Sequence, residues 1–204
     1  MRLTGDKLSA VRGGRTLFAD LAFSVDAGGA LIVTGPNGAG KTTLIRTIAG
    51  LLSPATGRIV LEDGAPDLPV SEQCHYVGHL SAIKPALSIE ENASFWSGFL
   101  GGTRERLGAA LDTFGLDALR DIPAGYLSAG QKRRLGLVRL LLAERPLWLL
   151  DEPTTSLDSA AQDVLTGVVN AHLAAGGLAV AATHVGLRFR SARELALGGG
   201  PGPA

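Results

Sequence analysis

Short apolar runs alternate with helix-like patterns along most of the chain. Residues 30–34, 147–150 and 178–182 are largely apolar runs of strand length, which indicate strands buried on both faces. Helical patterns follow the first two runs, at residues 43–52 and 157–175. The apolar faces of these two helices are expected to consist of Leu44, Ile45, Ile48, Leu51 and Leu52, and of Ala161, Val164, Leu165 and Val168. This alternation predicts an α/β fold with a mostly parallel sheet covered by helices.

The first part of the chain has a different pattern, typical of hairpins. Residues 2–11 and 17–26 read as two strands joined by the turn at residues 12–15, with apolar and polar residues alternating toward the end of the second strand. Two further short strands are expected at residues 58–61 and 74–78. We therefore expect an N-terminal antiparallel β-subdomain beside the parallel sheet.

A helical segment is inserted before the strand at residues 147–150. Ser88 and Glu91 have the spacing of a capping box at a helix N-terminus, and glycines 101–102 end that helix. A second helix is expected at residues 104–114 and a short third at residues 116–120. With the start of the next helix, these elements form a helical subdomain of about residues 81–135.

The helix expected at residues 131–143 has one clear apolar face. Leu135, Val138 and Leu142 form this face. Lys132, Arg133 and Arg134 are expected to form a solvated face of the same helix rather than a binding patch.

The length, charge balance and cysteine content of the chain limit the classes of protein to which it can belong. The chain has 204 residues, which suits one domain, here residues 1–197, followed by a Gly/Pro tail at 198–204 that is expected to be disordered. Nineteen basic and nineteen acidic residues balance, so no net field favours nucleic acid or an anionic membrane. Cys74 is the only cysteine, which suits a reducing compartment. Charges and a proline interrupt the most apolar stretch, residues 135–150, so any membrane contact is expected through partner proteins.

A phosphate-binding loop lies between the strand at 30–34 and the helix that follows. It has the pattern G-x-x-x-x-G-K-[ST] and consists of Gly35, Pro36, Asn37, Gly38, Ala39, Gly40, Lys41, Thr42 and Thr43. Its glycines allow backbone N–H groups to point at an anion, and the helix N-terminus adds its positive dipole end. Lys41 is expected to reach the phosphates and the Thr42 hydroxyl to bind Mg²⁺.

Two carboxylates follow the apolar run at residues 147–150. Because ligands of parallel sheets bind at the carboxyl ends of strands, Asp151 and Glu152 are expected beside the phosphate-binding loop. Asp151 is placed to hold Mg²⁺, partly through water, and Glu152 to orient or deprotonate an attacking water.

A second helix N-terminus suited to an anion lies at residues 127–131, Leu-Ser-Ala-Gly-Gln. By itself this sequence is a helix cap. Its position between the phosphate-binding loop and Asp151 favours a functional role, with Ser128, Gly130 and Gln131 as candidate nucleotide-binding residues.

These three elements, in this order, resemble the ATP-binding subunit of ABC transporters. The resemblance extends to Ser156-Leu157-Asp158 and to His184, which match the family's D-loop and switch histidine. It implies a P-loop NTPase with a RecA-like core, whose substrate is ATP with Mg²⁺ and whose catalytic residues are Lys41, Glu152 and His184. It also implies that two copies enclose ATP head to tail, and that the helical subdomain contacts integral membrane subunits.

Two positions depart from the family pattern. The aromatic residue that stacks on adenine is replaced near Arg12, which leaves Arg12 or Phe18 as candidates for that contact. A glutamine that senses Mg²⁺ is missing, and His79 stands at or next to its place. Of the other histidines, His172 is expected on a helix surface, and no pair has the spacing of a metal site.

Further motifs resemble one branch of the family, the ATPase of the haem exporter in bacterial cytochrome c maturation. They are Arg15–Phe18, Tyr76–His79, Ile83-Lys84, Glu91-Asn92, Leu127–Arg134 and Leu147–Pro153. The resemblance implies a peripheral subunit on the cytoplasmic face of the inner membrane. The alternatives are an ABC transporter ATPase with another cargo, a non-transport ABC protein, and a regulatory protein that binds ATP without hydrolysing it.

Overall fold

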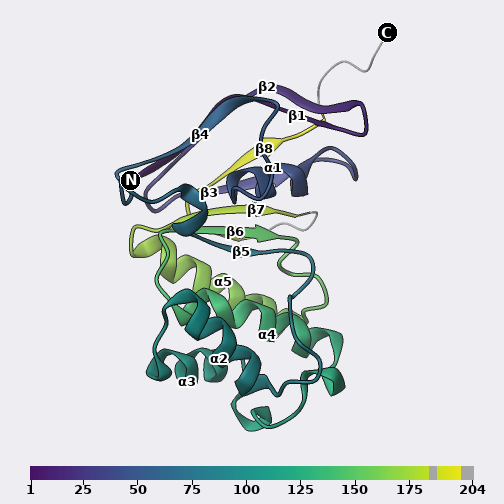
Figure 1. Ribbon diagram of the computed structural model, residues 1–204, viewed down its shortest axis with the longest axis vertical. Helices are drawn as coiled ribbons and strands as arrows, with labels where there is room; N and C mark the ends of the chain where they lie inside the picture. The colour runs from purple at the N-terminus through teal and green to yellow at the C-terminus, as the bar shows by residue number, and fades with distance from the viewer. Residues whose placement is uncertain (184–187, 199–204) are drawn as a thin grey trace.

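The computed structural model describes residues 1–183 and 188–198. Figure 1 shows an antiparallel sheet, a parallel sheet and a group of helices stacked in layers, with helix α1 (Lys41–Ile48) between the two sheets. Helix α1 contacts the parallel strands and belongs to the same apolar cluster as residues of the antiparallel sheet. The larger helices cover the opposite face of the parallel sheet. The expected α/β fold is confirmed.

The parallel sheet has the order β5-β6-β7-β3-β8. Its strands are β3 (Ala30–Thr34), β5 (Cys74–Val77), β6 (Leu147–Asp151), β7 (Leu178–Ala182) and β8 (Ala192–Ala196). Every neighbouring pair is parallel, so the carboxyl ends of the strands meet at one edge. All five residues of β6 and of β7 are buried; the continuous apolar runs predicted this for residues 147–150 and 178–182, and Asp151 is buried as well.

Strand β8 was not predicted from the sequence. It is an edge strand paired only with β3 among the described strands, and most of its residues are exposed. Because the Ala-Arg-Glu-Leu-Ala sequence contains no apolar run, its strand conformation comes from pairing with β3 rather than from a local pattern.

The antiparallel sheet has the order β2-β1-β4 and is built from β1 (Arg2–Arg12), β2 (Arg15–Asp26) and β4 (Thr56–Glu62). Arg12 and Arg15 are paired across the turn at the end of the predicted hairpin. This turn brings Arg12 toward the edge where the parallel strands end.

Two predicted helix faces need correction. Helix α1 ends at Ile48 because Ala49 caps it and Gly50 has a left-handed φ of 70°, so Leu51 lies outside the helix and is 58% exposed. The second is helix α5 (Ser159–Ala174), where Val164 is 38% exposed.

The apolar face of α5 is rotated from the predicted one. Leu165, Val169 and Leu173 are its buried residues, whereas Ala161 and Val168 are partly buried. Residues at i, i+4 and i+8 lie on one side of a helix, and so do the residues of the predicted face. The sequence alone did not distinguish them.

The helical segment consists of α2 (Ile89–Leu100) and α3 (Arg104–Thr113), both packed on α4 (Ala129–Leu142). The predicted capping box of Ser88 and Glu91 is confirmed, and residues 117–119 form only a 3₁₀ turn. Asn92, which is 3% exposed, holds the preceding loop through bonds to the main chain of Lys84, Leu87 and Ser88. No helix in the described part of the chain is long and apolar enough to span a membrane.

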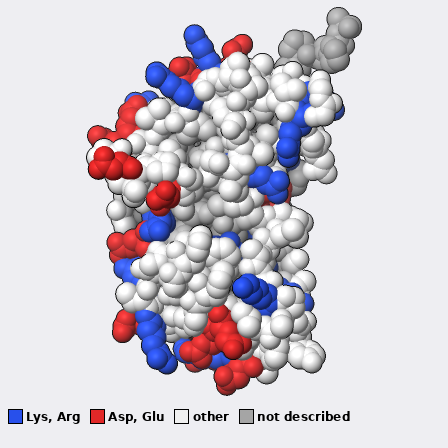
Figure 2. All heavy atoms as spheres, in the orientation of Figure 1, with Lys and Arg blue, Asp and Glu red and all other residues white. Residues whose placement is uncertain are grey.

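Figure 2 shows charges of both signs mainly along the margins of the face drawn, with a group of acidic side chains at its lower end and no broad basic patch. The equal numbers of basic and acidic residues in the sequence match this appearance. The surface of this face therefore has no strong field of one sign.

His75, on β5, is a buried histidine outside the phosphate-binding region. It is 2% exposed, its Nε2 is 2.8 Å from the main-chain oxygen of Ala143, and its ring meets Trp148 edge to face. Burial lowers the pKa of His75 to about 4 from its ordinary 6.5. The unfolded chain therefore takes up a proton on this residue at a higher pH than the folded chain does.

Stability is expected to fall as the pH drops from about 6.5 toward about 4, because the protonated form of His75 favours the unfolded chain. Between about pH 7.5 and pH 5 we expect His75 to account for a loss of about 2 kcal/mol in the free energy of unfolding. Urea unfolding at both pH values measures this loss. His75→Gln cannot titrate, so an equally large pH dependence in this variant would contradict the assignment. His172, whose pKa burial also lowers, remains as a background contribution of the same sign.

Candidate functional site

The phosphate-binding loop joins β3 to α1 at the carboxyl edge of the parallel sheet. Gly35 has a φ of 135°, and a Cβ atom there would lie 2.4 Å from the main-chain oxygen of Leu197. Gly40 has a φ of 101° and precedes the first residue of α1. Only glycine fits such a close approach and such backbone angles without strain.

Lys41 lies within the loop rather than in solvent. Its side chain is 7% exposed, and Nζ donates hydrogen bonds to the main-chain oxygens of Gly35 at 2.6 Å and Pro36 at 3.1 Å. The loop therefore curves around a positive charge. Because Gly40 has no side chain to cap α1, the first N–H groups of the helix are left for an anion.

Asp151 lies at the end of β6, directly beside Thr42. It is 1% exposed, and its Oδ1 accepts a hydrogen bond from the Thr42 hydroxyl at 3.0 Å. Within the described chain, Oδ2 of Asp151 is buried and has no hydrogen-bond partner. A carboxylate oxygen with no other partner, next to a hydroxyl, is a donor set that fits Mg²⁺.

Glu152 follows in a left-handed conformation, with a φ of 48°. Its main-chain N–H donates to the oxygen of Ala182 on β7 at 2.8 Å, which holds the turn against the sheet. A non-glycine residue in this region is strained, and such strain is often found where a side chain must be aimed at a site. Glu152 is half-buried and lines the cavity described next.

A cavity of about 580 Å³ lies over the loop. Its size is in the range that binds drug-sized ligands and nucleotides. The residues that matter for its chemistry are Lys41, Thr42, Glu152, His79, Arg12 and Leu17. The structure thus brings together the loop, the carboxylate after β6 and the turn of the first hairpin.

The two candidates for contact with a base differ in accessibility. Arg12 lines the cavity, together with Leu17, which was not among the predicted nucleotide-binding residues. Phe18 is 8% exposed and lies behind the loop, where a Cβ at Gly40 would be 3.1 Å from its ring. The burial of Phe18 favours Arg12 over Phe18 for contact with adenine, and this assignment stays a prediction. His79 is exposed and lines the same cavity.

Ser128, Gly130 and Gln131 do not line this cavity in the described chain. Ser128 caps α4, its Oγ accepting from the N–H of Gln131 at 3.2 Å, and Gln131 Oε1 accepts from the N–H of Ser128 at 2.8 Å. Gly130 packs closely on residue 156, because a Cβ there would lie 2.9 Å from the oxygen of Ser156. His184 lies outside the described residues.

The expected solvated face of α4 is only partly correct. Lys132 and Arg134 are half-buried, whereas Arg133 is 4% exposed. The Arg133 guanidinium is directed inward, toward the end of β6. A run of three basic residues gave no indication that one of them is buried, because all three have the same polarity.

A protein-family model described as "ABC transporter" matches residues 18–155, more than half of the chain. The chain belongs to the ABC transporter ATPase family. This ABC ATPase is therefore an ATP-binding and ATP-hydrolysing subunit.

Curated relatives of this ABC ATPase match over nearly the whole chain. The cytochrome c biogenesis ATP-binding export protein CcmA of Bradyrhizobium diazoefficiens is 55% identical, over 98% of this chain and 99% of the relative. The protein of the same name from Nitrobacter winogradskyi is 52% identical with the same coverage.

Solved structures of ATP-binding cassettes have the same fold. An ATP-binding subunit of an ABC transporter has a TM-score of 0.81 and 28% identity, covering 91% of this chain and 80% of that one. A dimeric ATP-binding cassette in a post-hydrolysis state, bound to ADP and phosphate, has a TM-score of 0.77 and 21% identity, covering 90% and 88%.

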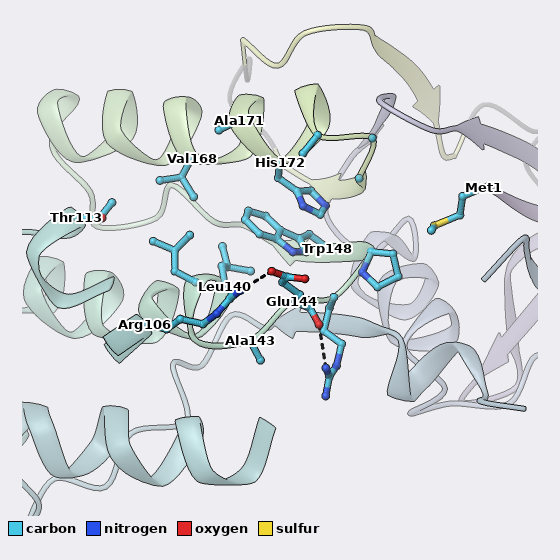
Figure 3. Close-up of a pocket in the computed structure, with 16 residues that line it drawn as sticks. Met1, Arg106, Thr113, Leu140, Ala143, Glu144, Trp148, Val168, Ala171 and His172 are labelled. Carbon is cyan, nitrogen blue, oxygen red and sulfur yellow. Dashed lines mark hydrogen bonds and ion pairs between the residues drawn. The ribbon is translucent and has the colours of Figure 1, made fainter. Parts of the chain in front are cut away.

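A second cavity, of about 610 Å³, lies away from the phosphate-binding loop, at the end of the sheet where β6 and β7 begin. Figure 3 shows His172 of α5 stacked on Trp148 of β6, and Arg106 of α3 reaching Glu144. The ring centroids of His172 and Trp148 are 3.9 Å apart. The prediction that His172 is a surface residue is wrong, because it packs on this indole. No phosphate-binding element lines this cavity, so it is not the ATP site.

Proposed function

We propose that this ABC ATPase powers the export step of bacterial cytochrome c biogenesis, with haem as the cargo handled by its membrane partners. The observation that carries the proposal is the near-complete match to relatives named for cytochrome c biogenesis export. An ATPase of the same family that serves another cargo is the main alternative, since nothing in this chain is expected to contact cargo.

Five residues are assigned roles in ATP turnover. Lys41 and the loop bind the phosphates, and Thr42 and Asp151 hold Mg²⁺, supported by the unpartnered Asp151 oxygen. When bound, Mg²⁺ supplies positive charge next to the phosphates. Glu152 orients or deprotonates the attacking water, supported by its place at the cavity, and His184 stabilises the developing charge.

The site of one copy is completed by a second copy in a head-to-tail dimer. Ser128 and Gly130 contact the γ-phosphate held by Lys41 of the other copy, and Gln131 is a further nucleotide-binding residue beside them. This arrangement is supported by their absence from the cavity of their own chain and by the N-terminus of α4, which is suited to an anion.

The helical subdomain, about residues 81–135, transmits the dimer's closure to integral membrane subunits. The ATPase is peripheral, on the cytoplasmic face of the inner membrane, and contacts the membrane through those partners only. Three exposed side chains of α2 and the turns near it, Phe95, Phe99 and Leu80, are suited to such a contact.

The proposal is tested in a strain that lacks the gene for this chain. We expect loss of covalent c-type haem, measured by haem stain of membrane proteins, and recovery with the wild-type gene. A gene encoding Lys41→Ala should not restore it, whereas Lys7→Ala, which changes an exposed lysine of β1 outside the ATP cavity and outside the helical subdomain, should. Normal c-type haem in the deletion strain would contradict the cytochrome c role and leave the ATPase activity intact.

A further inference from the structure

Arg133 is a buried cation held by main-chain oxygens. Nη2 donates to the oxygens of Asp151 at 3.0 Å and Glu152 at 2.7 Å, and Nε donates to Pro153 at 3.1 Å. Nη1 donates to Gly78 at 2.7 Å. Each nitrogen of the guanidinium therefore has a carbonyl partner, and these partners come from two separate segments.

These contacts compensate the cost of burying a charge. A buried guanidinium needs its N–H groups satisfied, and the rigid fork of arginine fixes the relative positions of all its acceptors. Burial lowers the pKa of Arg133, and the nearby negative charges of Asp151 and Glu152 act in the opposite direction. The fork thus fastens the strained turn at Glu152 to the segment that contains His79.

Arg133 also joins this turn to the helix that begins at Ser128. It lies five residues after Ser128, about 7.5 Å along the axis of α4. A rigid helix turn and a rigid fork therefore connect the capped N-terminus of α4 with the main chain of Asp151 and Glu152.

We propose that Arg133 is a positioning residue, which sets the orientation of Glu152 relative to Ser128 and Gly130 on α4. Because Glu152 serves the ATP of its own chain and α4 the ATP of the second copy, Arg133 couples the geometry of the two ATP sites. This inference rests on the proposed head-to-tail dimer and on the proposed role of Glu152. It assigns a role in turnover to a residue that touches neither nucleotide.

Arg139, six residues further along α4, provides a matched control. It is 7% exposed and bonds the main-chain oxygens of Gly136, Tyr76 and Ser81, so it has the same burial and the same kind of partners. None of these hydrogen bonds reaches Asp151, Glu152 or Pro153. An Arg→Lys change at either position keeps the charge and loses the fork.

The test compares Arg133→Lys and Arg139→Lys in the full chain, assembled with the membrane subunits that co-purify with it. We expect Arg133→Lys to lower kcat for ATP by about tenfold or more, since small misplacement of a catalytic group is costly. The KM for ATP should stay within about twofold, because the phosphate-binding loop is untouched. Arg139→Lys should lower the Tm by a similar amount and leave kcat within about twofold of wild type.

The outcomes separate this inference from the proposed function. A wild-type kcat in Arg133→Lys, or an equal loss in Arg139→Lys, would overturn it, while loss of turnover in Glu152→Gln would still support the proposed base. If Glu152→Gln hydrolyses ATP at the wild-type rate, Glu152 is not the base, and Arg133 cannot act on turnover by orienting it. Should Arg133→Lys not fold, Arg133→Gln replaces it. If neither folds while Arg139→Lys does, Arg133 is a structural residue only and the inference is overturned.

Discussion

Replacing Lys41 with alanine is expected to abolish ATP turnover, with a loss of about 100-fold or more in kcat/KM. The substitution removes the charge at the centre of the loop, and with it the hydrogen bonds to the oxygens of Gly35 and Pro36. The variant therefore loses both the cation expected to face the phosphates and the hydrogen bonds that shape the loop. Phosphate release by the purified chain with Mg²⁺ and ATP measures the effect.

Two further variants separate the contributions of Lys41. Lys41→Arg keeps the charge, but a planar fork does not fit a buried position that holds a compact ammonium, so turnover should stay low. Lys84→Ala removes an exposed lysine that lies over the ring of Phe95 and should leave turnover near wild type. Substantial turnover in Lys41→Ala would mean that the cavity over the loop is not where ATP is hydrolysed.

Glu152→Gln is expected to trap an ATP-bound dimer. The substitution keeps the size of the side chain and removes its ability to accept a proton, which should lower kcat by about 100-fold or more. ATP binding should persist because Lys41, Thr42 and Asp151 are unchanged. Size-exclusion chromatography with Mg²⁺ and ATP should then show a stable dimer that the wild type forms only briefly.

The control for this variant is Glu72→Gln, which changes an exposed carboxylate in the turn before β5. It should neither slow turnover nor stabilise a dimer. Turnover near wild type in Glu152→Gln would show that another group activates the water. His79, which lines the same cavity, would then be the first candidate.

Local signals in the sequence predicted the centre of the fold. The runs at 147–150 and 178–182 are continuous and apolar, and the capping box at Ser88 is a pattern within four residues. Such features depend on short segments, so the sequence contains them directly. Strand β8 depends on its pairing with β3, and no short segment contains that information.

The same difference between local and long-range information decided which parts of the candidate site could be predicted. The phosphate-binding loop, Asp151 and Glu152 were predicted because a motif and a strand end determine their positions. Arg12 and Phe18 could not be distinguished as contacts for adenine because the sequence does not say which side of the loop a neighbouring ring occupies. Arg133 was misassigned because burial of a cation depends on carbonyl groups supplied by segments distant in the sequence.

The close contact between Gly35 and Leu197 has a consequence for synthesis of the protein. Leu197 follows β8 and donates its N–H to the oxygen of Thr34, so the back of the phosphate-binding loop is built by residues made long after the loop itself. A growing chain on the ribosome already contains the whole motif from Gly35 to Thr43 but lacks the segment that supports it. The contact between Leu197 and this loop can therefore form only late in translation, after Asp151 and Glu152 have been made.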